Sequence, residues 1–218
     1  MKKLLIIGLV VLAVAAGVWW FVLRGDSSND TQASQDADTS IPQAYKATDD
    51  VSFDSYTSEF NPNLKLRYPS SWIVAEGEAN TADFQVITLE SGQDLNGFYM
   101  CMNMDDYAAD DKSDLSIPDI QVVAVEPFKT EGIKDGLYLV TFKRTKYPND
   151  YQFGLTDVAP EVGANVFTDQ ITSDSGRRLQ VWGRFNCRET ERPSMTQEQF
   201  DNSQLFHEAK SVLASLQF

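Results

Sequence analysis

The chain begins with an uninterrupted apolar run, residues 4–23, bounded by two lysines before it and Arg24 after it. An α-helix rises 1.5 Å per residue, so a helix of this length spans roughly 30 Å, the thickness of a bilayer's hydrocarbon core. No face of the run is polar, which distinguishes it from the amphipathic helix of a globular core. We therefore predict that residues 1–24 form an N-terminal transmembrane anchor.

The basic residues that precede the run predict its orientation. Lys2 and Lys3 mark the cytoplasmic side, because cytoplasmic flanks of membrane spans are enriched in lysine and arginine. The protein is then a single-pass membrane protein with a cytoplasmic N-terminus and an extracytoplasmic C-terminal domain. A cleaved secretory signal is the alternative, since residues 13–15, Ala-Val-Ala, match a cleavage pattern. The apolar run continues to residue 23, beyond that pattern, and this favours the retained anchor.

The next segment, residues 25–50, consists mainly of Ser, Asp, Thr, Gln, Ala and Asn. It offers too little apolar surface to offset the entropy lost on folding, so we predict a disordered polar tether. Residues 51–218 then form one extracytoplasmic domain of ordinary size.

The predicted domain is strongly acidic. The whole chain has a formal net charge of −14, and residues 25–218 carry −17 because three basic residues and no acidic ones lie in the first 24 positions. Such a charge repels nucleic acid, and the sequence contains no basic stripe with interleaved aromatic residues. We therefore exclude nucleic acid as a partner.

Alternating apolar and polar residues predict a series of β-strands in this domain. A hairpin is also predicted, with strands at 165–172 and 177–186 and a turn that uses the positive φ accessible to Gly176. The other predicted strands are 64–68, 72–74, 84–89, 98–104, 120–125, 137–143 and, more weakly, 151–155.

The C-terminal segment predicts a helix. Thr196 is a suitable N-cap, and Gln199 completes a capping-box pattern. An apolar stripe follows at helical spacing, formed by Leu205, Ala209, Val212, Leu213 and Leu216. Together these patterns predict an α+β fold with a central antiparallel sheet, flanking helices and the C-terminal helix packed on the sheet.

Two stretches resemble the PsbP-like domain, which belongs to the PsbP/Mog1-type folds. One is Tyr-Pro-Ser-Ser-Trp at residues 68–72, and the other is the C-terminal end, Ser-Val-Leu-Ala-Ser-Leu-Gln-Phe at residues 211–218. The resemblance covers only the two ends of the domain. It implies an α-β-α sandwich and a non-enzymatic accessory or binding role, and it transfers no catalytic residues.

Pro69 and Trp72 have structural interpretations of their own. Pro69 ends a strand and presets a turn, and Trp72 supplies a large side chain to the core directly afterwards.

The two cysteines, Cys101 and Cys187, both fall in or next to predicted strands of the exported domain. An oxidising compartment and an even number of cysteines predict a disulfide, with two buried free thiols as the alternative. Metal binding by these cysteines is not predicted, because the only histidine, His207, has no ligand-like spacing to either of them.

A dense acidic run is the sharpest charge cluster of the chain. Its members Asp105, Asp106, Asp110, Asp111 and Asp114 carry the oxygen ligands that Ca²⁺ prefers. The run lacks the alternating aspartates and the closing glutamate of a calcium loop, so a solvated loop that serves in recognition is the preferred interpretation.

We predict no catalytic residues and no cofactor. Ser203 and His207 have a spacing that allows contact on a helix, but neither a nucleophile elbow nor a phosphate-binding loop is present. The sequence therefore predicts a membrane-anchored, non-catalytic binding or accessory module that recognises an envelope protein or an extracellular ligand. The alternatives are an extracellular hydrolase with dispersed site residues and a structural component of the bacterial cell envelope.

Overall fold

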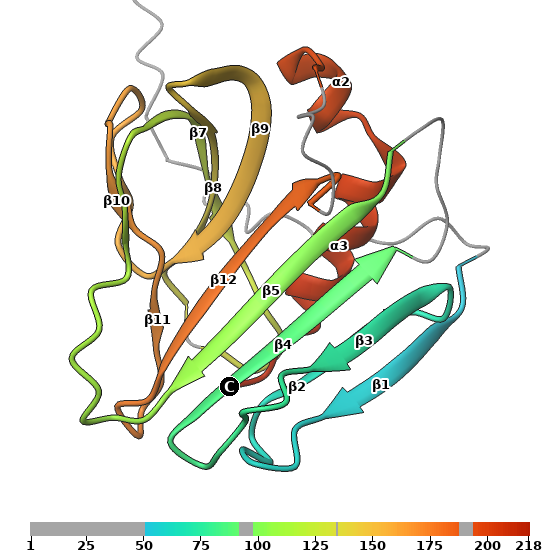
Figure 1. The fold of residues 1–218 in the computed structure, drawn as a ribbon, viewed down its shortest axis with the longest axis vertical. Helices are drawn as coiled ribbons and strands as arrows, with labels where there is room; N and C mark the ends of the chain where they lie inside the picture. Colours follow the sequence, from blue (N-terminus) through green and yellow to red (C-terminus); the bar gives the residue numbers. More distant parts are fainter. Residues whose placement is uncertain (1–50, 92–97, 134, 188–193) are drawn as a thin grey trace, which may run out of the picture. The chain divides into compact units, whose positions relative to one another are not determined.

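The structure is a computed structural model that describes residues 51–91, 98–133, 135–187 and 194–218 (Figure 1). The predicted anchor (residues 1–24) and tether (residues 25–50) lie outside these residues. Within the described part of the chain, none of the helices has the length and apolar character needed to cross a bilayer.

The described chain is built mainly from antiparallel strands, with two helices close to its end. The strands are β1 (Phe53–Thr57), β2 (Lys65–Pro69), β3 (Trp72–Glu76), β4 (Phe84–Ser91), β5 (Met100–Tyr107), β6 (Ser116–Ile117), β7 (Ile120–Phe128), β8 (Leu137–Arg144), β9 (Tyr147–Thr156), β10 (Phe167–Thr168), β11 (Ile171–Thr172) and β12 (Arg178–Phe185), and the helices are α2 (Gln197–Asp201) and α3 (Gln204–Ala214).

One large sheet organises these strands in the order β3-β4-β5-β12-β9-β8-β7, with β11 paired to the first residues of β12. The hairpin β1–β2 and the short pair β6–β10 lie outside it. Every strand pair is antiparallel, and β12 lies between β5 and β9 although β6 to β11 separate it from β5 in the sequence. This non-local pairing places the ends of β5 and β12 side by side (Figure 1).

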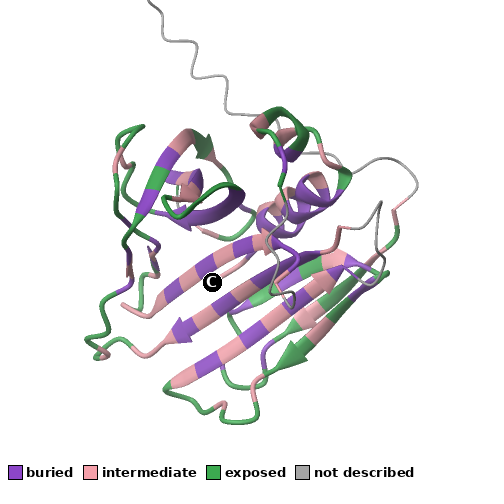
Figure 2. Ribbon diagram, turned by 45° about the horizontal axis from the view of Figure 1, so that its top comes forward, coloured by how far each residue is buried: buried purple, intermediate pink, exposed green. Residues whose placement is uncertain are grey.

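Burial alternates along the central strands, as a sheet with one core-facing side requires (Figure 2). In β12 the buried positions are 179, 181, 183 and 185. The residue at 183 is glycine, and a Cβ there would lie only 2.3 Å from the Phe153 ring. The glycine thus lets the Phe153 ring cross β12 and reach Phe206 of α3, 5.3 Å away between ring centroids.

The predicted α+β class, with helices flanking the sheet, is wrong. The structure is mostly β, with 48% strand and 10% helix, and both helices lie near the C-terminus. Helix α3 covers one face and contributes Phe206, Ala209 and Leu213 to the main core. On the other face, the far end of the sheet curls over and encloses a second small core around Phe142 and Phe167. The sheet therefore covers part of itself where helices were predicted.

Backbone hydrogen bonds between β7 and the loop before β10 hold the curled end of the sheet in place. Residues 163–165 pair with β7, since Gly163 N–H donates to the Val122 carbonyl at 2.9 Å and Val122 N–H donates to the Ala164 carbonyl at 2.9 Å. Strand β9 is consequently buried on both faces over residues 150–156.

The C-terminal helical segment is interrupted. Thr196 caps α2 in the predicted capping box with Gln199, which is confirmed, but this helix ends after one turn and a half. Ser203 then caps α3 by accepting a hydrogen bond from the Phe206 amide at 3.2 Å. Two short capped helices therefore replace the single helix that the apolar stripe predicted.

Candidate ligand-binding cavity

A polar cavity of about 400 Å³ opens where four separate segments of the chain meet. The segments are the loop that follows β1, the first residue of β2, the turn between β11 and β12, and the segment after α3 with its neighbour Gly132. The lining residues are Asn61, Asn63, Lys65, Gly132, Ser173, Asp174, Ser175, Arg177, Gln217 and Phe218.

A buried carboxylate lies directly behind this lining. Asp106 is completely buried on the core side of β5 and accepts three hydrogen bonds. Asn61 Nδ2 and Gln85 Nε2 donate to its Oδ2 at 2.9 and 2.8 Å, and Arg177 Nε donates to its Oδ1 at 2.9 Å. Such a charge is tolerated in a core only when it is paired and hydrogen-bonded, as it is here.

Arg177 joins this network to the cavity. Its Nη1 also donates to the Ala82 carbonyl at 3.0 Å, so two sides of the guanidinium are fixed by the protein. Its Nη2 is enclosed and has no hydrogen-bond partner. About one fifth of the side chain is exposed, and it lines the cavity wall.

The loop after β1 is held by side-chain hydrogen bonds to its own backbone. The Ser58 hydroxyl accepts from the amides of Phe60 and Asn61 at 3.1 and 2.9 Å and donates to Gln85 Oε1 at 2.6 Å. Asn61 Oδ1 accepts from the Asn63 amide at 3.2 Å. Short polar side chains favour such local turns, and these fix the positions of Asn61 and Asn63 at the cavity.

The turn between β11 and β12 forms the opposite wall. Gly176 N–H donates to the Ser173 carbonyl at 2.9 Å, and Gly176 has the predicted positive φ, +81°. The hydroxyls of Ser173 and Ser175 lie 2.9 Å apart. The hairpin turn is thus confirmed, and its residues Ser173, Asp174 and Ser175 line the cavity.

The third wall is made by the segment after α3. Lys65 and Gln217 exchange backbone hydrogen bonds at 3.0 and 2.9 Å, which adds this segment to the edge of β2. Gly132 is required beside it, because a Cβ at that position would lie 2.6 Å from Gln217 Cγ.

The five predicted acidic ligands do not converge. Asp105 and Asp106 are neighbours on β5 and therefore point to opposite faces of the sheet. Asp110 is exposed. Asp111 and Asp114 accept hydrogen bonds from the amides of Ser113 and Ser116 at 2.7 and 2.9 Å. The side-chain hydroxyls of these serines, and then their amides, lower the pKa of both carboxyls.

Arg178 fastens the acidic loop to the sheet. Its Nη2 donates to Asp111 Oδ1 at 3.1 Å and to the Asp111 carbonyl at 2.8 Å, and its Nη1 donates to the Ser113 carbonyl at 2.9 Å. These contacts explain why a loop rich in acidic residues keeps a defined path.

Two carboxyl groups on the other face of the sheet, those of Asp105 and Asp169, have raised pKa values. Burial raises the pKa of Asp105 to about 6. Burial also raises the pKa of Asp169 well above its usual range, the nearby Asp105 charge raises it further, and the amides of Val181 and Leu155 offset this only in part. Neither oxygen of Asp169 accepts a hydrogen bond of ordinary geometry.

No sequence pattern indicated a special role for Asp169. It stands alone between two short strands, and it is buried because its side chain lies over Gly154, where a Cβ would be 3.0 Å from its Oδ1. Asp105 and Asp169 line neither the polar cavity nor the second cavity described below.

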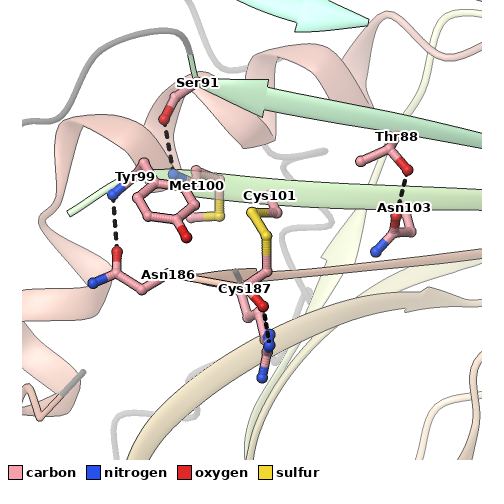
Figure 3. Close-up of a disulfide and its surroundings, with 9 residues drawn as sticks. Thr88, Ser91, Tyr99, Met100, Cys101, Asn103, Asn186 and Cys187 are labelled. Atoms are coloured by element: carbon pink, nitrogen blue, oxygen red, sulfur yellow. Dashed lines mark hydrogen bonds between the residues drawn. A yellow bond between two sulfur atoms is a disulfide. The ribbon is translucent and has the colours of Figure 1, made fainter. Parts of the chain in front are cut away.

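The predicted disulfide between Cys101 and Cys187 is confirmed (Figure 3). Cys101 is on β5 and Cys187 follows β12, and their Cα atoms are 6.1 Å apart. Around the bond, Tyr99 N–H donates to Asn186 Oδ1 at 3.0 Å, and Arg184 Nη2 donates to the Cys187 carbonyl at 2.7 Å. These contacts hold the end of β12 against β5.

The structure also shows where Pro69 and Trp72 lie, the two residues for which the sequence predicted structural roles. Pro69 is the last residue of β2 and is buried. Trp72 opens β3, is 4% exposed, and donates from Nε1 to the buried Glu208 of α3 at 2.8 Å. This contact joins the β3 edge of the sheet to the helix.

Ser203 and His207, whose spacing allows contact on a helix, each have a backbone carbonyl close to the side chain. The Ser203 hydroxyl caps α3 and donates to the Phe200 carbonyl at 2.9 Å. His207 Nε2 lies 2.9 Å from the Asp201 carbonyl oxygen. A second, more apolar cavity of about 400 Å³ lies beside Ser203, and its lining includes Phe98 and Ser194, each next to residues that the structure does not describe.

Comparisons with known proteins identify no relative of this chain. The chain matches no protein-family model, no curated protein and no solved structure at a significant level, so the resemblance to the PsbP-like domain stays a prediction.

Proposed function

We propose that this chain is a non-catalytic binding module, held outside the cytoplasm by its N-terminal segment, that recognises an envelope or extracellular ligand in the polar cavity. The observation that carries the proposal is the buried network behind the cavity. Asp106, Asn61 and Arg177 are fixed by mutual hydrogen bonds, and two of them line the cavity. A site whose polar groups are already ordered loses little entropy when a ligand binds.

The cavity also has the general character of a small-molecule site. Its volume falls within the usual range of such sites, and it combines a few fixed polar groups with an apolar contact from Phe218. A site of this kind suits a ligand, or one projecting group of a larger partner, rather than a flat protein interface.

The hydrolase alternative has one observation in its favour, the raised pKa values of Asp105 and Asp169. General acid–base catalysis requires such groups within reach of a bound substrate. Because neither residue lines a described cavity, the binding module is the better account.

Hydrogen exchange tests the proposal. The full-length chain, reconstituted in nanodiscs, is compared with and without a soluble extract of envelope material. We expect slower exchange at residues 58–65 and 173–177, because a ligand in the cavity shields these backbone amides.

Two matched variants provide the controls. Ser175→Trp places a large side chain at the cavity from an exposed turn position and should abolish the protection. Ser71→Trp makes the same change at an exposed turn outside the cavity and should leave it intact. Protection confined to other parts of the domain, or none with any extract, contradicts the proposal.

A further inference from the structure

A short strap connects the two cores of the domain. The strap, residues 167–172, carries β10 at one end and β11 at the other (Figure 1). Phe167 belongs to the small second core, and Ile171 belongs to the main core. Strand β10 pairs with β6, which directly follows the acidic loop of residues 108–115, and β11 pairs with β12 of the large sheet. The strap therefore fastens the end of the acidic loop to the large sheet.

The strap crosses the sheet at a fork. The ladder between β9 and β12 stops at the pair Gly154–Trp182. Past that pair, β9 continues beside β8, whereas β12 takes β11 as its new neighbour. Asp169 lies over this fork, because a Cβ on Gly154 would be 3.0 Å from its Oδ1. The middle of the strap thus places a carboxyl group where two strands separate.

The carboxyl group of Asp169 lacks strong hydrogen-bond partners. The residue has no exposure, and neither carboxyl oxygen accepts a hydrogen bond of ordinary geometry. The amides of Val181 and Leu155, the first residues past the fork, stabilise its charge only in part. A buried carboxylate without a full set of hydrogen bonds is costly, whereas the protonated acid is tolerated much better. The closed strap is therefore compatible with the protonated acid and is opposed by the ionised form.

Titratable groups of β5, β12 and the acidic loop form one cluster with Asp169. They are Asp105 and Tyr107 of β5, Arg178 of β12 and Asp111 of the acidic loop. Asp105 adds a like charge beside Asp169. The cation of the cluster, Arg178, donates instead to Asp111 Oδ1 at 3.1 Å, and β9 presents only Gly154 to Asp169. The cluster therefore holds no countercharge that is committed to Asp169.

From the fork, the strap and the uncompensated carboxyl group, we propose that the strap is a proton-dependent latch. Protonated Asp169 keeps the strap closed over the fork and the acidic loop fastened to the sheet. Loss of the proton draws Asp169 out to water, which separates β10 and β11 from their partners and releases the acidic loop. The inference does not depend on the proposed function, because it uses none of the residues that line the polar cavity.

The direction of the pH dependence follows from burial. Burial raises the pKa of Asp169 well above its usual range, so the closed latch keeps its proton at a pH at which the open latch has lost it. The closed form is favoured in acid, and the open form gains as the pH rises above about 4, the ordinary value of an aspartate. One proton released on opening shifts the equilibrium by up to about tenfold per pH unit, until the pH reaches the raised pKa.

Hydrogen exchange at several pH values tests the latch. The full-length chain in phosphatidylcholine nanodiscs is measured from about pH 5 to about pH 8, and each rate is corrected for the intrinsic effect of pH on amide exchange. We expect the protection of amides 115–117 and 167–172 to fall by up to about tenfold per pH unit. The amides of β4 should keep their protection, because β5 separates β4 from the fork.

Variants identify the titrating group. Asp169→Asn keeps the size of the side chain without its charge, so the protection of the strap should no longer depend on pH. Asp105→Asn removes the like charge that raises the pKa of Asp169, so the total loss of protection should be smaller. Asp110→Asn, at an exposed aspartate of the acidic loop, is the control and should behave as the unchanged protein does.

Each contrary result overturns a stated part of the inference. If the strap of Asp169→Asn loses protection as the unchanged protein does, another group titrates and the role of Asp169 is wrong. If β4 and the strap lose protection equally, the domain opens as a whole and there is no latch. Protection of the strap that stays constant between pH 5 and pH 8 in the unchanged protein overturns the inference outright.

Discussion

The buried charges are the residues on which single substitutions should have their largest effects. The pair Asp106–Arg177 has a carboxylate with no exposure and a guanidinium that is mostly buried. Arg177→Met leaves that carboxylate without its countercharge, so we expect the free energy of unfolding to fall by about 3–5 kcal/mol. Urea denaturation at neutral pH measures this change.

The surface ion pair Arg67–Glu131 supplies the comparison, because about half of each side chain is exposed. Arg67→Met should cost less than about 1 kcal/mol. Equal losses in the two variants would show that Asp106 does not depend on Arg177.

The acid pair Asp105 and Asp169 predicts a pH dependence of stability. Both carboxyls have a raised pKa in the folded protein, so folding favours their protonated forms. Their contribution to stability is therefore complete below about pH 4 and is lost as the pH rises through about 6 and beyond. In thermal unfolding, Asp169→Asn should raise the melting temperature at pH 8 and flatten its decline between pH 5 and pH 8.

Asp110→Asn is the control, since it removes one exposed charge from the neighbouring loop. If the melting temperature of Asp169→Asn falls between pH 5 and pH 8 as steeply as that of the unchanged protein, then ionisation of Asp169 does not destabilise the fold.

At the scale of elements, the disulfide joins two strands that β6 to β11 separate in the sequence. It closes a loop of 86 residues, and in the chain-entropy model a loop of this length stabilises the folded state by about 3–5 kcal/mol. We expect the double variant Cys101→Ala, Cys187→Ala to lose stability in this range in urea denaturation. Peptide mass spectrometry without reduction provides the direct check, and free thiols at both positions would contradict the bond.

Alternating burial made strand β4 predictable, and the predicted strand 84–89 falls within it. The predicted strand 137–143 falls within β8, although residues 139–142 of β8 are all buried. The weak prediction at 151–155 has a physical reason, because β9 is buried on both faces and lacks alternation. The predicted strand 165–172 is broken at Asp169, which lies between β10 and β11 and whose backbone amide donates instead to Leu115.

The fold class and the cavity depend on contacts that no local pattern contains. The apolar stripe of α3 predicted a helix on a sheet but gave no sign that the sheet's opposite face would be covered by its own curled end. The cavity unites Asn61, Arg177 and Gln217, which are far apart in the sequence. The turn at 173–176 and the strands that carry Lys65 and Arg177 were predicted, but only as structural elements without a ligand-binding interpretation.

At the scale of the whole molecule, the apolar N-terminal run leads us to expect that the domain is held at a membrane. The full-length chain should sediment with membranes and resist extraction by carbonate, because residues 4–23 suit the hydrocarbon core. Protease added to the outer side should digest residues 51–218, and a variant that begins at residue 25 and carries an unrelated secretion signal should be released. A mature chain whose mass lacks the first 15 residues would instead support the cleaved signal.

The path of the Cys101–Cys187 bond also determines how the domain responds to force. When the two ends of the chain are pulled apart, tension passes through the bond and bypasses the 86-residue loop. Roughly 300 Å of polypeptide, at up to 3.6 Å per residue, therefore cannot be drawn out. The loop contains β6 to β12, so the larger part of the sheet carries no load while the hairpin β1–β2 and helix α3 are stripped away.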